Sequence, residues 1–132
     1  VIVIDIGTAI TVDVVSQDAT FLGGIIAPGL RMSAEALHEK TDLLPLIEIN
    51  EPLPRLMGQS TPECVRSGVI YGSVAMIDGL VGRIRAHIGL NAKVVATGGY
   101  SELIKPISET IEYSDPHLVL KGLRLVYQRE HK

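Results

Sequence analysis

The sequence predicts one α/β domain in which a mixed β-sheet is flanked by helices. Three apolar, β-branched segments near the amino terminus are separated by short turns, which is typical of adjacent antiparallel strands. A helix and then a longer helix follow, after which strand and helix patterns alternate. The 132 residues suffice for one domain with a hydrophobic core but not for two ordinary ones, and no internal repeat or low-complexity linker occurs. We therefore treat residues 1–132 as a single domain.

The first segment predicts a β-hairpin closed by small residues. Residues 1–6 form an apolar, β-branched strand, and residues 11–15 form a second strand that returns beside it. Gly7, Thr8 and Ala9 make the tight turn between them. Because Gly7 has no Cβ, backbone N–H groups and the hydroxyl of Thr8 can approach a bound anion.

Asp5 stands at the carboxyl end of the first strand, where it would repel a phosphate. We expect it to hold a cation, a metal-bound water or a donor hydroxyl instead. The alternative is an ordinary hairpin in which Asp5 and Asp13 cap a turn.

The next segment predicts a third strand over residues 21–26 and a helix over residues 30–40. Gly23 and Gly24 weaken the strand and indicate a bulge or the close approach of another group. The apolar face of the helix contains Leu30, Ala34 and Leu37. Residues 41–55 contain three prolines and cannot form one regular element, so we expect a surface crossing or a functional loop.

A long helix is predicted from Ser60 to Ile88. Ser60 supplies a hydroxyl cap, proline follows in the first turn, and Glu63 faces the helix dipole, while Gly89 ends the helix. Small residues recur along it at alternating four- and three-residue steps, and this small-residue stripe consists of Gly68, Gly72, Ala75, Gly79, Gly82 and Ala86. Such a stripe lets another backbone pack closely. The partner is either a helix of the same domain or the same helix in a second subunit, and we state a homodimer as a hypothesis.

The carboxy-terminal part predicts short alternating elements. Residues 93–97 form a buried strand that turns at Gly98 and Gly99, after which Ser101 caps a short helix that Pro106 ends.

A brief strand at residues 111–113 precedes a last helix, which Asp115-Pro116 caps and opens. Its apolar residues are Leu118, Leu120, Leu123, Leu125 and Val126. A solvated basic tail, residues 128–132, follows.

Composition excludes several classes of function. The net charge is −3, aromatic residues make up 4 %, and no basic cluster exceeds Arg83-Ile-Arg85, so we expect no nucleic-acid surface. The single cysteine, Cys64, rules out an internal disulfide and suits a reducing cytoplasm. The four histidines lack metal-ligand spacing. No apolar run is long enough to suggest a membrane span. Because the sequence begins inside a strand without Met, we expect it to be a fragment.

Three glycine-containing turns follow strands, at Gly7-Thr8, Gly23-Gly24 and Gly98-Gly99. Together they resemble the ribonuclease H-like, actin-like ATPase domain shared by actin, hexokinase, acetate kinase and the heat-shock chaperone ATPases. The resemblance implies that the first turn grips phosphate and that the last one lies against adenosine. Taken alone, residues 97–99 are equally well explained as a strand-to-helix turn.

The order of the motifs resembles that of one family, the type III pantothenate kinases. The matching motifs are Asp5-x-Gly7-Thr8-Ala9-x-Thr11-x-Asp13, Gly23-Gly24-x-Ile26-x-Pro28-Gly29, Leu44-Pro45, Gly58-x-x-Thr61, Ser67-Gly68-x-x-Tyr71-Gly72, and Asp115-Pro116 with Lys121-Gly122-Leu123-Arg124. The resemblance covers essentially the whole chain but only the carboxy-terminal half of that family. It implies a preceding domain and, upstream of Val1, a Gly-x-Asp-Arg segment whose Asp is the catalytic base. Neither occurs here, so we expect no catalytic residue in this chain.

The resemblance assigns roles to five residues around the turns. Asp5 is similar to the ligand of a monovalent cation, K⁺ or NH₄⁺, which would separate its charge from phosphate. Gly7 and Thr8 match the ATP phosphate contacts, and Gly98 and Gly99 match the adenosine turn.

Thr61 is similar to a contact to pantothenate, and it can also serve the helix start. Asp13 is the only carboxylate near enough to act as a base in this chain, and we interpret it as structural or ion-linked. The resemblance further implies ATP with Mg²⁺ as cofactors and a homodimer whose substrate pocket lies near the interface.

Two functions follow. One is the ATP-dependent phosphorylation of pantothenate to 4′-phosphopantothenate, the first step toward coenzyme A, in the cytoplasm. This chain would supply the second half of the site, and a separate chain would carry the amino-terminal half. The alternative is a non-enzymatic dimerisation or transcription accessory module on the same fold.

Overall fold

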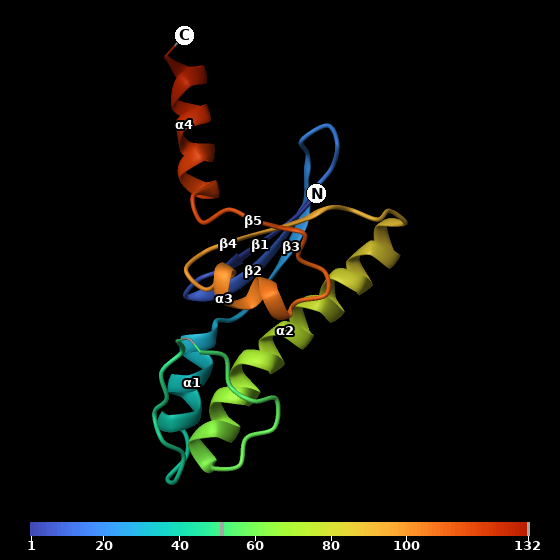
Figure 1. Cartoon of the computed structure of the whole chain (residues 1–132). Helices are drawn as coiled ribbons and strands as arrows, with labels where there is room; N and C mark the ends of the chain where they lie inside the picture. Colours follow the sequence, from blue (N-terminus) through green and yellow to red (C-terminus); the bar gives the residue numbers. More distant parts are fainter. Residues whose placement is uncertain (51, 132) are drawn as a thin grey trace.

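The computed structural model describes residues 1–50 and 52–131, which form a five-stranded mixed sheet flanked by helices (Figure 1). The sheet order is β3-β2-β1-β4-β5. The first three strands pair antiparallel, and β1, β4 and β5 pair parallel. The strands are β1 (Ile2–Ile6), β2 (Ala9–Val15), β3 (Phe21–Pro28), β4 (Val94–Thr97) and β5 (Tyr113–Ser114). The predicted α/β class with a mixed sheet is confirmed.

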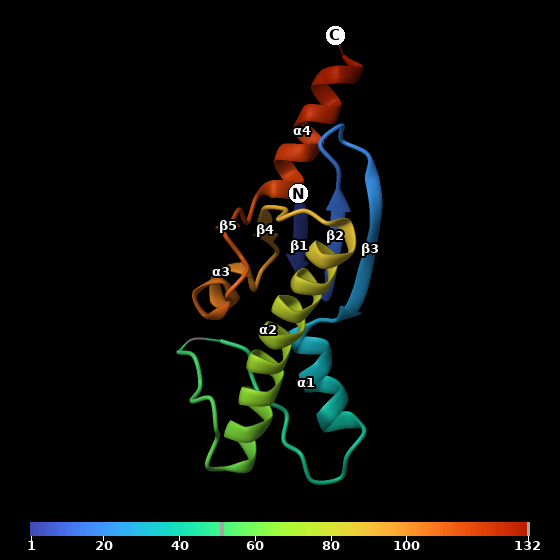
Figure 2. The same ribbon diagram turned by 90° about the vertical axis from the view of Figure 1, so that its right-hand side faces the viewer.

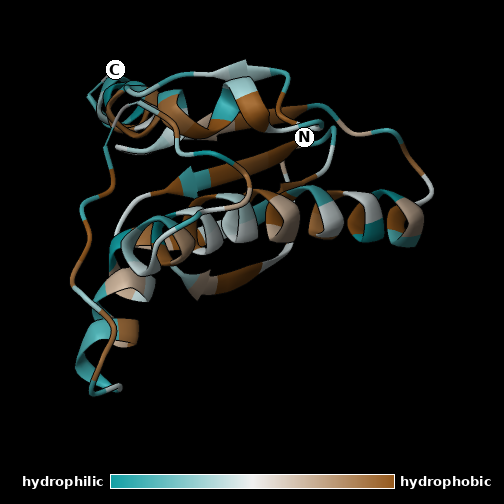
Figure 3. Cartoon of the chain, turned by 60° about the horizontal axis from the view of Figure 1, so that its bottom comes forward, coloured by the Kyte–Doolittle hydropathy of each residue, from teal (hydrophilic) through white to brown (hydrophobic). Residues whose placement is uncertain are grey.

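The hydrophobic core lies between the sheet and α2 (Thr61–Ile88), which crosses one sheet face. Ile2, Ile4 and Ile6 of β1 are fully buried, whereas the alternate residues Val3 and Asp5 are half-buried. From α2, the fully buried Ile70, Ile77 and Val81 join the same core. Each such side chain contributes about 1.5–3 kcal/mol by leaving water. In Figure 3 the strands beside α2 are predominantly hydrophobic.

The predicted ends of α2 are confirmed. The Ser60 hydroxyl accepts a hydrogen bond from the Glu63 N–H, and the Glu63 carboxylate accepts one from the Gln59 N–H at 2.8 Å. At the other end, Gly89 has φ +67°, the left-handed cap that glycine adopts without strain.

The length and composition of α2 are sufficient for a membrane span, so the expectation that no segment reaches that length was wrong. Nearly half of its most apolar stretch is nevertheless buried, as in the core helix of a globular domain.

The small-residue stripe of α2 is exposed along its whole length. A Cβ built at Gly68, Gly72, Gly79 or Gly82 would meet no atom within 4 Å. The helix α1 (Leu30–Glu39) packs beside α2 but does not fill the stripe. The alternative in which a helix of the same domain covers the stripe is therefore wrong for the residues that the structure describes.

The segment between α1 and α2 contains no helix or strand in its described residues, as its prolines predict. Side chains of α2 hold it through main-chain carbonyls. Arg66 donates to Asn50 and, at 2.6 Å, to Pro52, while Ser67 donates to Leu56. The Tyr71 hydroxyl donates to the carbonyl of residue 54 at 2.9 Å. The described residues between α1 and α2, 40–50 and 52–60, thus form what we term the strap. It crosses the amino-terminal half of α2 (Figure 2).

Polar contacts also fasten α2 to the segment before β5. The Asp78 carboxylate accepts hydrogen bonds from the Ser108 and Thr110 hydroxyls, both at 2.6 Å, and from two backbone N–H groups. Burial raises the pKa of Asp78, but these hydrogen bonds together hold it below its ordinary value. Arg85 forms a 3.3 Å ion pair with Glu112.

The short elements after β4 differ from the prediction. Ser101 is not a cap but the first residue of α3 (Ser101–Ile104), and its hydroxyl donates to the Gly98 carbonyl at 2.8 Å. Pro106 lies inside a 3₁₀ turn, η1 (Lys105–Ile107), that continues α3. The brief strand predicted at residues 111–113 is found at residues 113–114, where it pairs with β4.

The last helix, α4 (Leu118–Glu130), begins three residues after Asp115, whose carboxylate accepts a hydrogen bond from the His117 N–H at 3.0 Å. It continues through most of the predicted solvated tail, and none of its residues is buried.

Candidate functional site

The turn between β1 and β2 lies against the start of α1. A Cβ on Gly29, the residue that caps α1, would overlap the carbonyl of Thr8 and approach the Gly7 carbonyl to 2.7 Å. Only glycine allows this contact. The turn is therefore held in place by the β3–α1 junction, although Gly29 lies more than 20 residues away in the sequence.

The second glycine turn meets the first at Asp5. Gly98 has φ +91°, and a Cβ there would overlap Oδ1 of Asp5. Tyr100 donates its N–H to the Ile6 carbonyl at 3.0 Å, which ties the end of β4 to the end of β1. Gly7 also approaches Oδ1 of Asp5, because a Cβ on it would lie 3.1 Å away. The Asp5 carboxylate thus stands between the two turns at the carboxyl ends of parallel strands, where open α/β sheets bind ligands.

The residues around Asp5 fit a hard cation. Oδ1 of Asp5 and the carbonyl oxygen of Ile6, which also accepts the Tyr100 N–H, both lie beside Gly98. Carboxylate and carbonyl oxygens suit hard cations. Within residues 1–50 and 52–131, no group of three or more His, Cys, Asp or Glu side chains could hold a metal ion.

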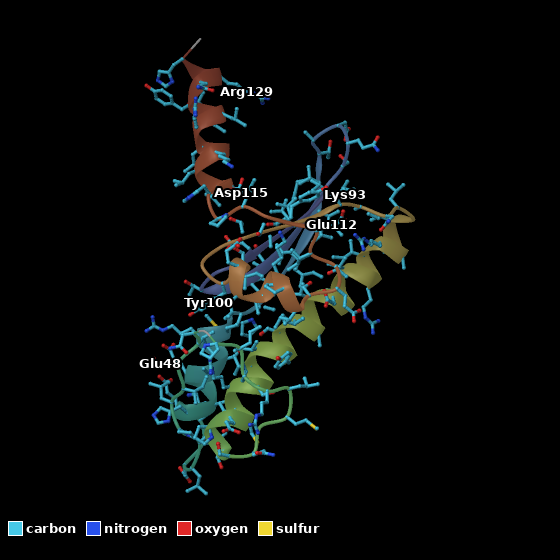
Figure 4. The ribbon with its side chains drawn as sticks, in the orientation of Figure 1. Glu48, Lys93, Tyr100, Glu112, Asp115 and Arg129 are labelled. Atoms are coloured by element: carbon cyan, nitrogen blue, oxygen red, sulfur yellow. The ribbon has the colours of Figure 1, made fainter. Side chains whose placement is uncertain are left out.

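A cavity of about 660 Å³ opens beside the two turns, lined by Gly7, Thr8, Arg31, Met32, Glu35, Gly99 and Tyr100. A second cavity of about 390 Å³ shares Arg31, Glu35 and Tyr100 and adds loop residues 46–50. The two form one cleft between the sheet end, α1 and the strap. In Figure 4, Tyr100 lies at the sheet end and Glu48 on the loop below it.

An ion pair on α1 borders this cleft. Arg31 Nε donates to Glu35 at 2.7 Å, and this hydrogen bond raises the pKa of Arg31. The Arg31 side chain is 76 % exposed. The guanidinium therefore remains charged and accessible where Thr8 presents its backbone and hydroxyl.

The structure brings together Asp5, Gly7, Thr8, Gly98 and Gly99, as the sequence predicts.

Thr61 does not join them. It lies exposed in the first turn of α2, at the end of that helix farthest from β4 (Figure 1), and it does not line the cleft. Asp13 also lies outside the cleft, with Oδ1 beside Gly24. Cys64 is exposed near the start of α2.

Sequence reasoning missed Arg31, Glu35, Tyr100 and the loop wall formed by residues 46–50. Tyr100 carried a local signal, because it directly follows the glycine turn. Arg31 and Glu35 carried only the four-residue spacing of a helical ion pair.

Comparisons with known proteins identify relatives of this chain. A family model described as type III pantothenate kinase matches residues 1–83. The type III pantothenate kinase of Chlorobium luteolum is 48 % identical over 133 residues, covering 97 % of this chain and 49 % of that protein. The Moorella thermoacetica enzyme is 44 % identical, with 97 % and 50 % covered. The chain thus spans about half the length of the curated relatives it matches.

A solved structure supports the fold. It is a Campylobacter jejuni protein described as a conserved Baf family transcriptional activator, with a TM-score of 0.67 and 23 % identity, covering 98 % of this chain and 57 % of that one. At this identity the likeness shows the fold alone. The family model, in contrast, matches 83 of the 132 residues, including the strand that carries Asp5 and the turn that contains Thr8. The chain therefore belongs to the type III pantothenate kinase family.

Proposed function

We propose that this chain supplies the carboxy-terminal half of a cytoplasmic enzyme that phosphorylates pantothenate with ATP, the first step of coenzyme A biosynthesis. The observation that carries the proposal is the position of Asp5 between two glycine turns at the head of a cleft. Family membership supports it. The strand order β3-β2-β1-β4-β5, with β2 antiparallel to its neighbours, supports the finer ribonuclease H-like, actin-like classification.

In this proposal the two turns bind the nucleotide. Thr8 contacts the ATP phosphates through its backbone N–H and its hydroxyl. Gly7, whose own N–H donates to the Ala9 carbonyl at 3.1 Å, lets the phosphates approach the turn because it has no Cβ. Gly98 and Gly99 lie against adenosine. Asp5 holds K⁺ or NH₄⁺, and Mg²⁺ arrives with ATP. Together these cations neutralise negative charge on the phosphoryl oxygens. The protein contributes mainly position and electrostatics, as in other phosphoryl transfers.

Pantothenate requires contacts that one copy of this chain does not bring together. Thr61, its proposed contact, lies away from the cleft. The exposed small-residue stripe of α2 supports a homodimer through that helix, with the pantothenate pocket near the interface. The catalytic base lies in the half of the family that this chain does not span, so the chain alone is expected to be inactive.

The first test is ADP release with ATP, Mg²⁺, K⁺ and pantothenate. The samples are this chain alone, and this chain mixed with the part of the Chlorobium luteolum kinase that it does not match. We expect pantothenate-dependent release in the mixture only. A complex that binds ATP without any turnover would contradict the kinase proposal.

The second candidate, a non-enzymatic dimerisation or transcription accessory module, has one observation in its favour. The similar Campylobacter jejuni structure carries a transcriptional activator description. A net charge of −3 opposes direct nucleic-acid binding, so such a module would act through protein contacts.

A further inference from the structure

The helix α4 presents an apolar face that no other described residue covers. Its 13 residues include none that is buried. Six large apolar side chains of α4 are 54–64 % exposed, and all but Leu125, which lies on the opposite side, form what we term the α4 stripe: Val119, Leu120, Leu123, Val126 and Tyr127. Figures 1 and 2 both show α4 projecting from the sheet, away from α1.

The spacing of the α4 stripe places its members on one side of the helix. Val119, Leu123 and Val126 are separated by four and three residues, and Leu120 and Tyr127 are seven apart. Two basic residues border the stripe. Because each residue of a helix is rotated by about 100° from the one before it, Arg124 lies on one side of the stripe and Arg129 on the other. Such a face is typical of a helix that packs against another structure and is unusual as a free surface.

The sheet fixes the direction in which α4 is presented. Asp115 donates its N–H to the Ala96 carbonyl of β4 at 2.8 Å, so the chain is tied to the sheet three residues before the helix begins. Lys121 Nζ forms a 2.6 Å ion pair with Asp115 Oδ2, which lowers the pKa of Asp115. Figure 4 shows Asp115 at the base of α4 and Arg129 near its far end. The helix therefore extends from an anchored start rather than from a free linker.

We propose that the α4 stripe packs against the half of a type III pantothenate kinase that this chain does not span. This rests on the proposed function, in which the chain is one half of the enzyme. The alignments cover 97–99 % of this chain but 49–51 % of the first five relatives, so each relative has about as many residues again. That length is sufficient for a second domain with its own core.

The position and charge of the α4 stripe favour this occupant. The small-residue stripe lies on α2, a different element, so packing along that stripe does not by itself account for the exposed apolar residues of α4. Arg124 and Arg129 predict acidic groups at the two edges of the receiving groove, and Glu130, at the last turn of the same face, predicts that the apolar centre ends there.

The test measures binding of this chain to the unmatched part of the Chlorobium luteolum enzyme. Leu123→Glu places a charge in the α4 stripe, and Gln128→Glu places the same charge on the opposite side as a matched control. We expect at least tenfold weaker binding for Leu123→Glu and unchanged binding for Gln128→Glu. Equal binding by both variants would overturn the proposal. Because Leu123 is outside the core, the melting temperatures of both variants should equal that of the wild type.

A second measurement uses the whole Chlorobium luteolum enzyme and does not depend on reassembly of halves. Backbone amides in the segment aligned with residues 118–130 should exchange hydrogen slowly there, and rapidly in this chain alone. Fast exchange in the whole enzyme would overturn the proposal. Self-association of this chain that Leu123→Glu abolishes would identify a second copy as the occupant and would also overturn it.

The outcome for α4 is separable from the outcome for the enzyme. A complex that requires Leu123 but releases no ADP supports the α4 stripe and contradicts the kinase proposal. Full turnover together with binding that Leu123→Glu does not weaken supports the kinase proposal. The same result contradicts the proposal that the α4 stripe packs against the other half of the enzyme.

Discussion

Gly98 lies so close to Asp5 that a single added methyl group at position 98 would overlap the Asp5 carboxylate. The contact joins the end of β4 to the end of β1. Glycine is also required at position 98 because φ there is +91°, a conformation that residues with a Cβ rarely adopt.

Gly98→Ala should therefore destabilise the fold by more than about 1 kcal/mol, because alanine is strained at positive φ and its Cβ overlaps Asp5. It should also weaken ATP binding by displacing the carboxylate. Gly99→Ala is the matched control, because a Cβ there meets nothing within 4 Å and its φ is not positive. Urea unfolding midpoints test the difference, and equal midpoints for the two variants would refute it.

Asp5→Asn should remove the dependence of turnover on K⁺ and lower the rate at least tenfold in the assembled enzyme, since the amide carries no charge for a cation. The fold should remain intact because Asp5 is half-buried and outside the core cluster. The measurement is ADP release across a KCl titration, with Asp13→Asn as the control outside the cleft. A potassium response that survives Asp5→Asn would exclude Asp5 from the cation site.

Gly72→Leu should abolish dimerisation while leaving the stability of the single chain unchanged. A Cβ at position 72 meets no atom within 4 Å outside the backbone of α2 itself, whereas a leucine side chain there would separate two helices packed through the small-residue stripe. Gly122→Leu on α4 is the control, because it is equally free of contacts. Sedimentation of both variants at micromolar concentration tests the dimer, and a wild-type monomer would contradict it.

Asp78→Asn should cost about 1.5–3 kcal/mol near pH 7, because the carboxylate accepts four hydrogen bonds that hold the 108–110 segment on α2. The folded-state pKa of Asp78 is lowered, so its contribution is complete above the ordinary carboxyl pKa of about 3.9. It is lost as the pH falls through the lower folded-state value.

The stability difference between wild type and Asp78→Asn should therefore shrink on acidification below about pH 4. Urea unfolding at several pH values measures it, with Glu109→Ala as the control, since residue 109 contributes only its backbone N–H. A difference that does not depend on pH would show that the charge of Asp78 is unimportant.

Thr61→Val should raise the pantothenate KM more than the ATP KM. The helix start should survive, because the hydroxyl that caps α2 belongs to Ser60. Thr8→Val is the contrasting variant, for which the ATP KM should rise more. Steady-state kinetics with each substrate varied in turn measures both. An effect of Thr61→Val on ATP alone would contradict the assignment.

The elements up to α2 could be predicted from sequence because their signals are local. Alternating isoleucines mark β1, and Ser60 and Gly89 mark the ends of α2. Two strands run further than predicted, because β2 begins at Ala9 instead of residue 11 and pairs there with Pro28, the last residue of β3. Ser101 was misassigned because its hydroxyl bonds to the preceding turn, a contact that depends on how β4 meets β1.

The cleft was predicted only in part, because some of its lining residues meet only through the packing of segments that are distant in the sequence. Asp5, Thr8 and Gly98 carry motifs, whereas Arg31 and Glu35 enter only because Gly29 brings the start of α1 against the Thr8 turn. Nor could the pattern of small residues decide which face of α2 stays uncovered, since that depends on where α1 packs.

The strap has a consequence for how this protein can change over evolution. Arg66, Ser67 and Tyr71 hold it chiefly through backbone carbonyls, which every amino acid provides. Side chains at positions 46–50, which form one wall of the cleft, can therefore be exchanged without losing the anchors. Substitutions there alter the shape and charge of the wall while the sheet and its two glycine turns stay the same. In the proposed enzyme, selectivity for different acceptor molecules can therefore diverge in this loop independently of the two glycine turns.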